Sequence, residues 1–335
     1  MSHPVECTID LDGSGRQAGR LVIPKSTNTG GWANHYIPIA AISSGAGPTA
    51  LVMGGNHGDE YEGQVACLRL FRELKPEQVP GRVIVIPCLS PEASKAGTRL
   101  WPSGANFNRS FPGRTDGPAN EQLAHFLTTV LFPMADYVID IHSGGNSDRF
   151  VPCSHMHVVD DPIQRSAMLE AMLAWNTDYC YLYIDVAGHG LLPVEAERQG
   201  KVVVTTELGG GGHVRAETNR IAWNGLTNVL RHAGVLDGEV VDRLQPATII
   251  DGRDLRNYIF APTSGIFEAL VDPADSVQEG QLVARIHSLE HPEREPESIY
   301  SPLAGVTACV RAISRCDQGD NLLGIGQPIS VDALS

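Results

Sequence analysis

The sequence has little of what marks several large classes of protein. Its seven cysteines are scattered, and no two of them have CxxC spacing. This pattern argues against a disulfide framework and against a zinc site built from thiolates. No apolar run approaches the roughly 20 residues that a helix needs to span a bilayer. The first residues, MSHPVECTIDLDGSG, contain no basic segment followed by an apolar one, so we predict a cytoplasmic protein without a signal peptide.

Basic charge is also scarce. The chain has 25 Lys and Arg against 39 Asp and Glu, which gives a net charge of −14. Proteins that bind nucleic acid usually present a basic surface to the phosphates. We therefore expect neither nucleic acid nor a membrane as a partner. With 335 residues, of which 42% are hydrophobic and 19% charged, the composition is typical of a globular protein with one large and one smaller domain.

Apolar strand-like runs alternate with helix-like patterns through the first 243 residues. Strands are predicted at 35–42, 49–55, 82–89, 137–145 and 201–212, and helices at 60–74, 120–132, 162–175 and 215–233. This alternation predicts an α/β domain with a mostly parallel sheet that helices cover on both faces. The ligand site of such a sheet is expected at the carboxyl ends of its strands.

The predicted secondary structure changes in residues 244–335, where short strands and turns follow one another. Residues 260–286 and 300–326 repeat one scheme: a proline, a Gly-Ile or Gly-Val pair, a strand, an acidic turn and a second strand. The duplication resembles the barrel-sandwich domains that carry biotin or lipoate on a lysine of the connecting hairpin. Here the connector, HSLEHPEREPES, contains no lysine. We therefore predict a structural β domain that is neither biotinylated nor lipoylated.

The segment GGNHGDEYEG crowds four possible metal ligands into six positions at the end of a predicted strand. His57 and Glu60 are three residues apart, which allows both side chains to point at one ion. His142 ends the predicted strand YVIDIH and could join them if the two strands are neighbours. Hydrolytic zinc sites use three protein ligands of these types. The alternative is a solvated turn; Asp59 and Glu62 lack the spacing and are assigned supporting roles.

A metal-bound water needs a general base, and Glu207 is the candidate. It ends the apolar run VVVTTE, where a charge needs a partner, although a surface Glu at a strand end is the alternative. The polar loop 96–113 supplies Arg99, Asn108 and Arg109. Guanidinium groups bind carboxylates and stabilise developing oxyanions. The alternative for this loop is an ordinary solvated segment.

Four motifs, GGNHGDE, NFNRSFPG, DIHSGG and TTELGGGG, occur in the order seen in the succinylglutamate desuccinylase/aspartoacylase family, which the chain therefore resembles. The resemblance implies a zinc amidohydrolase with a carboxypeptidase-like α/β domain and a smaller β-rich C-terminal domain. It also implies one Zn²⁺ per chain held by His57, Glu60 and His142, with Glu207 as the catalytic carboxylate. By the same resemblance Asn108 and Arg109 would hold the substrate carboxylate.

Arg99 is the best match for the family's oxyanion-stabilising arginine. Within the family the chain most resembles members that deacetylate Nα-acetyl-2,4-diaminobutyrate in ectoine breakdown, so a small N-acyl amino acid is the expected substrate. The cationic 4-amino group would need an acidic partner, for which Asp148 and Glu195 are candidates.

Desuccinylation, N-acetylaspartate hydrolysis and carboxypeptidase activity are the alternative functions within the family, and a carrier or binding module is the alternative outside it. A homo-oligomer is the expected assembly.

Overall fold

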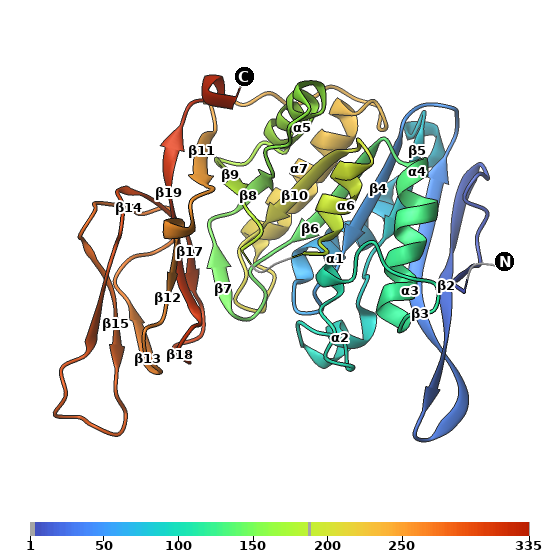
Figure 1. Ribbon diagram of the computed structural model, residues 1–335. Coiled ribbons are helices and arrows are strands. Elements are labelled where there is room, and N and C mark those ends of the chain that lie inside the picture. The colour runs from blue at the N-terminus through green and yellow to red at the C-terminus, as the bar shows by residue number, and fades with distance from the viewer. Residues whose placement is uncertain (1–3, 187–188, 335) are drawn as a thin grey trace.

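A large mixed sheet between helices forms most of the molecule (Figure 1). The computed structural model describes residues 4–186 and 189–334. In sheet order the strands are β1 (Glu6–Cys7), β2 (Gly15–Thr27), β3 (Gly30–Ser43), β5 (Arg82–Ile86), β4 (Thr49–Gly54), β6 (Tyr137–His142), β10 (Val202–Glu207), β8 (Cys153–Met156), β9 (Tyr179–Tyr183), β11 (Thr248–Gly252), β19 (Asn321–Ile329), β17 (Gly305–Arg311) and β14 (Ser276–Val277). Two short strands pair beside this path, β12 (Tyr258–Phe260) with β19 and β7 (Asp148–Phe150) with β17.

The centre of the sheet is parallel: β5, β4, β6 and β10 follow one another in the same direction. Parallel pairing also joins β8 to β9 and β9 to β11, so the sheet is mixed with a large parallel part. The long β2–β3 hairpin joins β5 in antiparallel fashion, and β8 is antiparallel to β10. A hairpin connects its strands by a tight turn and so imposes the antiparallel arrangement, whereas a parallel connection needs a crossover.

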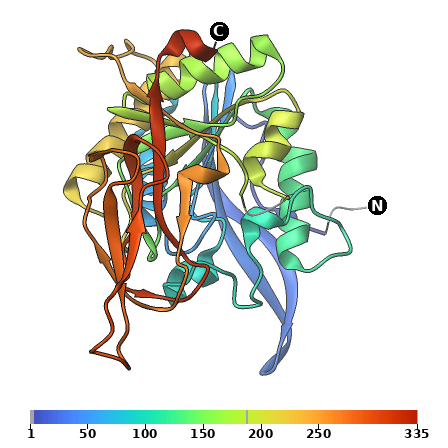
Figure 2. The same cartoon turned by 60° about the vertical axis from the view of Figure 1, so that its left-hand side comes forward.

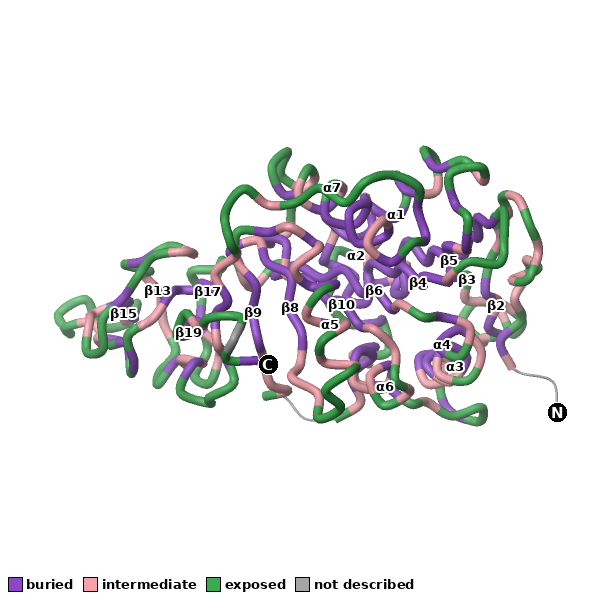
Figure 3. Tube along the Cα trace, turned by 90° about the horizontal axis from the view of Figure 1, so that it is seen from above, coloured by how far each residue is buried: buried purple, intermediate pink, exposed green. Residues whose placement is uncertain are grey.

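Helices cover the central strands on both faces. They are α1 (Tyr61–Glu73), α2 (Pro91–Ala96), α3 (Ala119–Phe126), α4 (Phe132–Met134), α5 (Pro162–Ala174), α6 (Leu192–Arg198) and α7 (Ala216–His232). Alternate residues of β4 enter two different cores: Leu51 and Met53 pack with α3 and α6, and Ala50 and Val52 pack with α1 and α7. Figure 3 shows the buried residues concentrated along these central strands.

The C-terminal residues extend the large sheet and add a second one. Strand β11 pairs in parallel with β9, which makes the sheet continuous across the proposed domain boundary at residue 243. The second sheet has the order β16 (Glu297–Tyr300), β15 (Leu282–His287), β13 (Gly265–Ala269), β18 (Arg315–Cys316). Its apolar residues share one core with those of β14, β17 and β19 of the large sheet. Figures 1 and 2 place this β-rich region at one end of the molecule and the β2–β3 hairpin at the other.

The expected strands and helices occur with shifted ends. Between the strand at 82–89 and the predicted helix at 120–132 the chain also forms α2 and a short 3-10 turn at Phe107–Arg109. The predicted helix 120–132 begins at Ala119 and continues through a π-helical turn, Leu127–Leu131, into α4. Among the described residues, no helix is both long enough and apolar enough to cross a membrane.

Candidate metal and catalytic site

Two neighbouring strand ends bring the candidate metal ligands together. His57 lies in the loop after β4, Glu60 immediately precedes α1, and His142 is the last residue of β6. Since β4 and β6 are parallel neighbours, their carboxyl ends meet at one edge of the sheet. His57 and His142 are 85 positions apart in the sequence, and this pairing of the strands brings them into one site.

Glycines allow α1 to approach this edge closely. A Cβ on Gly54 would lie 2.5 Å from the backbone of Gly63, and a Cβ on Gly63 would lie 2.5 Å from the carbonyl oxygen of Ile141. Such contacts leave no room for a side chain at either position. The start of α1, and with it Glu60, is thereby held against the end of β6.

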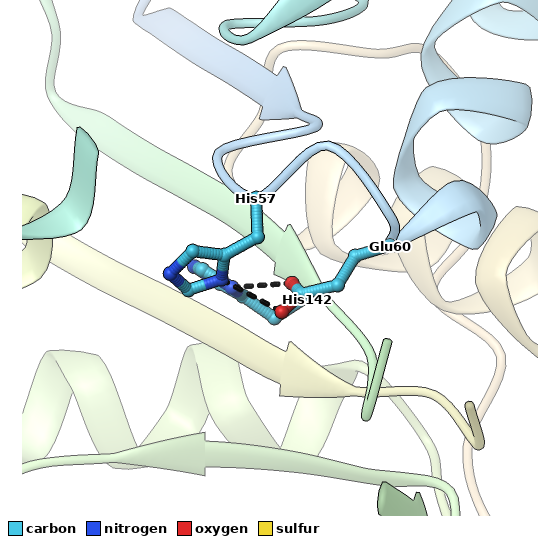
Figure 4. Close-up of side chains that lie close together, drawn as sticks. All are labelled: His57, Glu60 and His142. Carbon is cyan, nitrogen blue, oxygen red and sulfur yellow. Dashed lines mark hydrogen bonds and ion pairs between the residues drawn. The ribbon is translucent and has the colours of Figure 1, made fainter. Parts of the chain in front are cut away.

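The three side chains point toward one another (Figure 4). Nδ1 of His57 lies 2.7 Å from Oε1 of Glu60, and Nδ1 of His142 lies 2.7 Å from Oε2 of the same carboxylate. All three residues are buried, and their candidate ligand atoms lie within 4.8 Å of one another. Two imidazole nitrogens and one carboxylate form a donor set that fits zinc and also suits other divalent ions.

Asp140 orients one of these imidazoles. Its Oδ2 lies 2.8 Å from Nε2 of His142 and also accepts a hydrogen bond of 2.8 Å from Nδ2 of Asn56. A carboxylate on the far nitrogen fixes the ring orientation and leaves Nδ1 to face an ion. Sequence reasoning missed Asp140. The available signal was its place two residues before His142, because alternate residues of a strand share a face.

The buried groups shift one another's pKa values. Burial opposes ionisation of Glu60, but the two imidazoles hold the pKa of its carboxyl well below the usual value. Burial lowers the pKa of His57, against the opposing effect of Glu60. At His142 burial is outweighed by Asp140 and Glu60, which raise its pKa well above the usual value. An ionised carboxylate and a neutral imidazole are the forms that ligate a metal, so Glu60 and His57 are already in them at neutral pH.

Glu207 lies beside this cluster. It ends β10, the parallel neighbour of β6, and is directly opposite His142 in the register. Its Oε2 is buried and has no hydrogen-bond partner among the described residues. Burial raises the pKa of Glu207 well above the usual value, and the negative charge of Glu60 adds to the rise. A carboxyl group with a raised pKa next to metal-ligating side chains is suited to carry a proton.

The loop 96–113, which is predicted to bind the substrate, lies next to the candidate metal ligands. Nη1 of Arg99 donates a hydrogen bond of 2.9 Å to Oε1 of Glu60, so its guanidinium group lies at the ligand cluster. The side-chain oxygen of Asn108 accepts a hydrogen bond of 2.8 Å from the backbone N–H of Leu192. Arg99, Asn108 and Arg109 all line one cavity with His57. The loop is therefore part of the site and not an ordinary solvated segment.

Asp59 and Glu62 make supporting contacts. Oδ2 of Asp59 accepts a hydrogen bond of 2.9 Å from the backbone N–H of Asn146, in the loop that follows β6. Oε1 of Glu62 accepts one of 3.3 Å from the hydroxyl of Thr218 on α7. Both carboxylates are buried and hold neighbouring elements around the ligand cluster.

The cavity has a volume of about 340 Å³, and the C-terminal region supplies part of its wall. Much of this wall is aromatic and comes from Phe150, Tyr181, Tyr183, Tyr258 and Phe260. Sequence reasoning missed these residues, because aromatic side chains in strands usually indicate only packing. Large apolar walls with few polar groups are typical of small-molecule sites.

Some of the remaining polar side chains line the cavity, and others lie outside it. Asp148 lines the cavity, whereas Glu195 is outside it and lies 3.8 Å from Arg198 of the same helix. His155 also lines the cavity, and its Nδ1 is 2.9 Å from the hydroxyl of Thr205. Burial lowers the pKa of His155 to about 3, so it is a neutral part of the wall.

The fold and the site together define a class of protein. A buried His-Glu-His cluster lies at the carboxyl edge of a parallel sheet, with a carboxyl group of raised pKa beside it and arginines in the same cavity. These are the components of a metal-dependent hydrolase.

Comparison with known proteins identifies the family to which the chain belongs. Residues 46–233 match the model of the succinylglutamate desuccinylase/aspartoacylase catalytic domain. The chain is 37% identical over 327 residues to an N-alpha-acetyl-L-2,4-diaminobutyric acid deacetylase of Halomonas elongata, covering 97% of this chain and 96% of the relative. The chain belongs to the succinylglutamate desuccinylase/aspartoacylase family and is an enzyme.

Solved structures agree with this assignment. A product-bound structure of the ectoine utilization protein EutE from Ruegeria pomeroyi superposes with a TM-score of 0.94 at 38% identity, covering 98% of this chain and 99% of that one. A succinylglutamate desuccinylase/aspartoacylase from Rhodobacter sphaeroides gives a TM-score of 0.92 at 36% identity, with coverage of 98% and 99%. The similarity therefore extends through the C-terminal β region as well as the catalytic part.

Proposed function

We propose that this enzyme is a zinc-dependent deacylase that hydrolyses Nα-acetyl-L-2,4-diaminobutyrate to acetate and 2,4-diaminobutyrate, a step of ectoine breakdown. The observation that supports hydrolysis most directly is the buried cluster of His57, Glu60 and His142 with Glu207 beside it. The substrate is inferred from the relatives, one of which is named as a deacetylase of that compound and another as an ectoine utilization protein.

One zinc ion per chain would be held by His57, Glu60 and His142. The fit depends on the buried N, N, O donor set and on Asp140, which holds the imidazole of His142 from behind. Zinc bound by such ligands supplies a Lewis acid for the acyl carbonyl and lowers the pKa of a bound water to about 7.

Glu207 is assigned the proton transfers. It accepts a proton from the attacking water and delivers it to the nitrogen of the leaving amine, so that the C–N bond breaks with a neutral amine as product. The raised pKa of its carboxyl favours this role, because a carboxylate with an ordinary pKa is a weaker base and would accept the proton of the attacking water less readily.

The arginines are assigned charge stabilisation and anchoring. Arg99 contacts Glu60 and so places a positive charge where the tetrahedral intermediate develops an oxyanion. Arg109 binds the α-carboxylate of the substrate, since a guanidinium group matches a carboxylate in charge and geometry. Asn108 uses its oxygen on the N–H of Leu192, which leaves its Nδ2 as a donor to the same carboxylate.

The C-terminal β region is proposed to be a barrel-sandwich domain that carries neither biotin nor lipoate. Its connector at 288–296 contains no lysine, and its aromatic residues instead form part of the cavity wall. We further propose that the enzyme is cytoplasmic and a homo-oligomer. All seven cysteines are free thiols, which suits a reducing compartment.

Two measurements on the purified full-length chain test this function. Elemental analysis should find about one zinc per chain, and a panel of N-acyl amino acids should give the highest kcat/KM with Nα-acetyl-L-2,4-diaminobutyrate. A higher value for N-succinylglutamate, N-acetylaspartate or a peptide would replace the substrate by that of another family activity. Absence of both bound metal and hydrolysis would refute the enzyme mechanism.

A further inference from the structure

The proposed carboxylate anchor accounts for one end of the amino acid and leaves its side chain unexplained. In Nα-acetyl-2,4-diaminobutyrate the side chain ends in an ammonium group. The cavity wall is largely aromatic and aliphatic, and it also carries the cations Arg99 and Arg109. A further cation brought into such a site needs an acidic partner, because burying an unpaired charge is costly.

Of the described residues that line the cavity, the acids are Asp148, Asp185 and Glu207. Glu207 is already assigned to proton transfer. Asp148 lies toward the ligand cluster, since it shares an adjoining polar cavity with Glu60, and its Oδ2 accepts a hydrogen bond of 2.7 Å from Ser147.

Asp185 occupies a different place, next to the carboxylate anchor. Its Oδ1 lies 3.6 Å from Nη2 of Arg109, and it lies in the loop that connects β9 to α6. The carboxylate and the ammonium of 2,4-diaminobutyrate are joined by a short carbon chain, so both can reach an Arg–Asp pair of this spacing. The positive Arg109 would face the carboxylate of the substrate, and the negative Asp185 would face its ammonium group.

Backbone contacts hold the two loops of this pair together. The N–H of Phe111 donates a hydrogen bond of 3.1 Å to the carbonyl oxygen of Gly190, while Leu192 is bonded to Asn108. Gly190 has a φ of +88°, and a Cβ there would lie 2.8 Å from the carbonyl oxygen of Arg109. These two hydrogen bonds hold residues 190–192, which follow Asp185 in the chain, against the loop that carries Arg109.

We propose that Asp185 is the specificity-determining residue that binds the 4-ammonium group of the substrate, while Arg109 binds its carboxylate. This inference rests on the proposed function. The same carboxylate repels substrates whose side chain ends in a carboxylate, such as acylated aspartate or glutamate, and so discriminates against them as well as favouring the cation.

The test compares two substrates on the zinc-loaded enzyme: Nα-acetyl-2,4-diaminobutyrate and Nα-acetylnorvaline, whose side chain has the same shape and no charge. In Asp185→Asn we expect kcat/KM for the diamino substrate to fall by about 10- to 100-fold, mainly through KM, because the amide oxygen can still accept a hydrogen bond but no longer carries the charge that pairs with the ammonium. The value for the norvaline compound should change by less than about threefold. Glu195→Gln is the matched control, since it removes an acid on α6 outside the cavity.

The possible outcomes separate the inference from the proposed function. If the wild type does not prefer the diamino substrate, both are overturned. If the wild type prefers it and Asp185→Asn keeps the preference, only the inference is overturned. An equal loss on both substrates would also overturn it, since Asp185 would then serve only to position Arg109. Zinc content measured in each variant shows that the ligand cluster is intact.

Discussion

At one end of the cavity, His57, Glu60 and His142 are placed by strand ends and the start of a helix, whereas at the other end Arg109 and Asp185 are placed by loops. The metal end is fully packed: each ligand is at most 5% exposed. At the anchor end the side chain of Arg109 is 27% exposed and that of Asp185 is 18% exposed.

The difference separates chemistry from specificity. Hydrolysis needs ligands held in a fixed geometry, which a buried sheet edge supplies. Substrate choice can change when loops change while the sheet stays as it is. Members of one family can therefore share the metal end and differ in the acyl amino acid that they accept.

The largest effect should follow from removing a metal ligand. His142→Ala should abolish zinc binding and lower kcat/KM by at least about 1,000-fold, because the stabilisation that the metal supplies is worth several kcal/mol. Elemental analysis and the deacetylase assay measure both effects. His213→Ala is the matched control, since His213 is exposed and its Nδ1 contacts the carbonyl oxygen of the nearby Gly211. A full zinc complement in His142→Ala would remove this residue from the ligand set.

Removing the proton carrier should leave the metal in place. Glu207→Gln keeps the shape of the side chain and should retain about one zinc per chain, while kcat falls by about 10²- to 10⁴-fold. Parallel metal analysis and steady-state kinetics separate this effect from loss of the ligand cluster. Turnover near the wild-type value would show that another group carries the proton.

A smaller effect at the metal end is expected from the residue behind His142. Asp140→Asn should weaken zinc binding by about 10- to 100-fold, because the imidazole loses the carboxylate that orients it. Competition with a chelator gives the affinity, and circular dichroism checks that the chain is folded. The prediction fails if the chelator concentration at half-loss of zinc is the same as in the wild type.

At the anchor end the loop contact can be tested by adding one methyl group. Gly190→Ala should raise KM about tenfold with zinc content unchanged, because the new Cβ meets the carbonyl of Arg109 and shifts the anchor. Gly200→Ala is the control: Gly200 also has a positive φ, +71°, but a Cβ there meets nothing within 4 Å.

Both glycine variants should lose about 1 kcal/mol of stability from the strained backbone, measured by denaturant unfolding. Only Gly190→Ala should change KM. An equal change of KM in both variants would mean that backbone strain, and not the contact with Arg109, is responsible.

Much of the metal end could be predicted from local sequence. The apolar run of β4 and the helical pattern of α1 frame His57 and Glu60, and the strand YVIDIH ends at His142. Each of these signals lies within a few residues of the group that it positions. The sequence leaves open whether these two strands are neighbours, and the register of β4 with β6 shows that they are.

The anchor end could not be predicted in the same way. The sequence offers Asp148 and Glu195 as candidates for the acidic partner, yet the acid beside Arg109 is Asp185. The two residues of this pair come from loops 76 positions apart, and the position of a loop depends on the elements that it contacts. No local pattern encodes such a contact.

The sequence by itself determined the strand and helix order, the motif that supplies the candidate metal ligands and the family, because apolar periodicity and short spacings are local properties. Only the tertiary structure decided that Asp185 lies beside Arg109, and that Tyr258 and Phe260 of the C-terminal region line the cavity. Those contacts join segments far apart in the chain, and packing of the whole molecule is what brings them together.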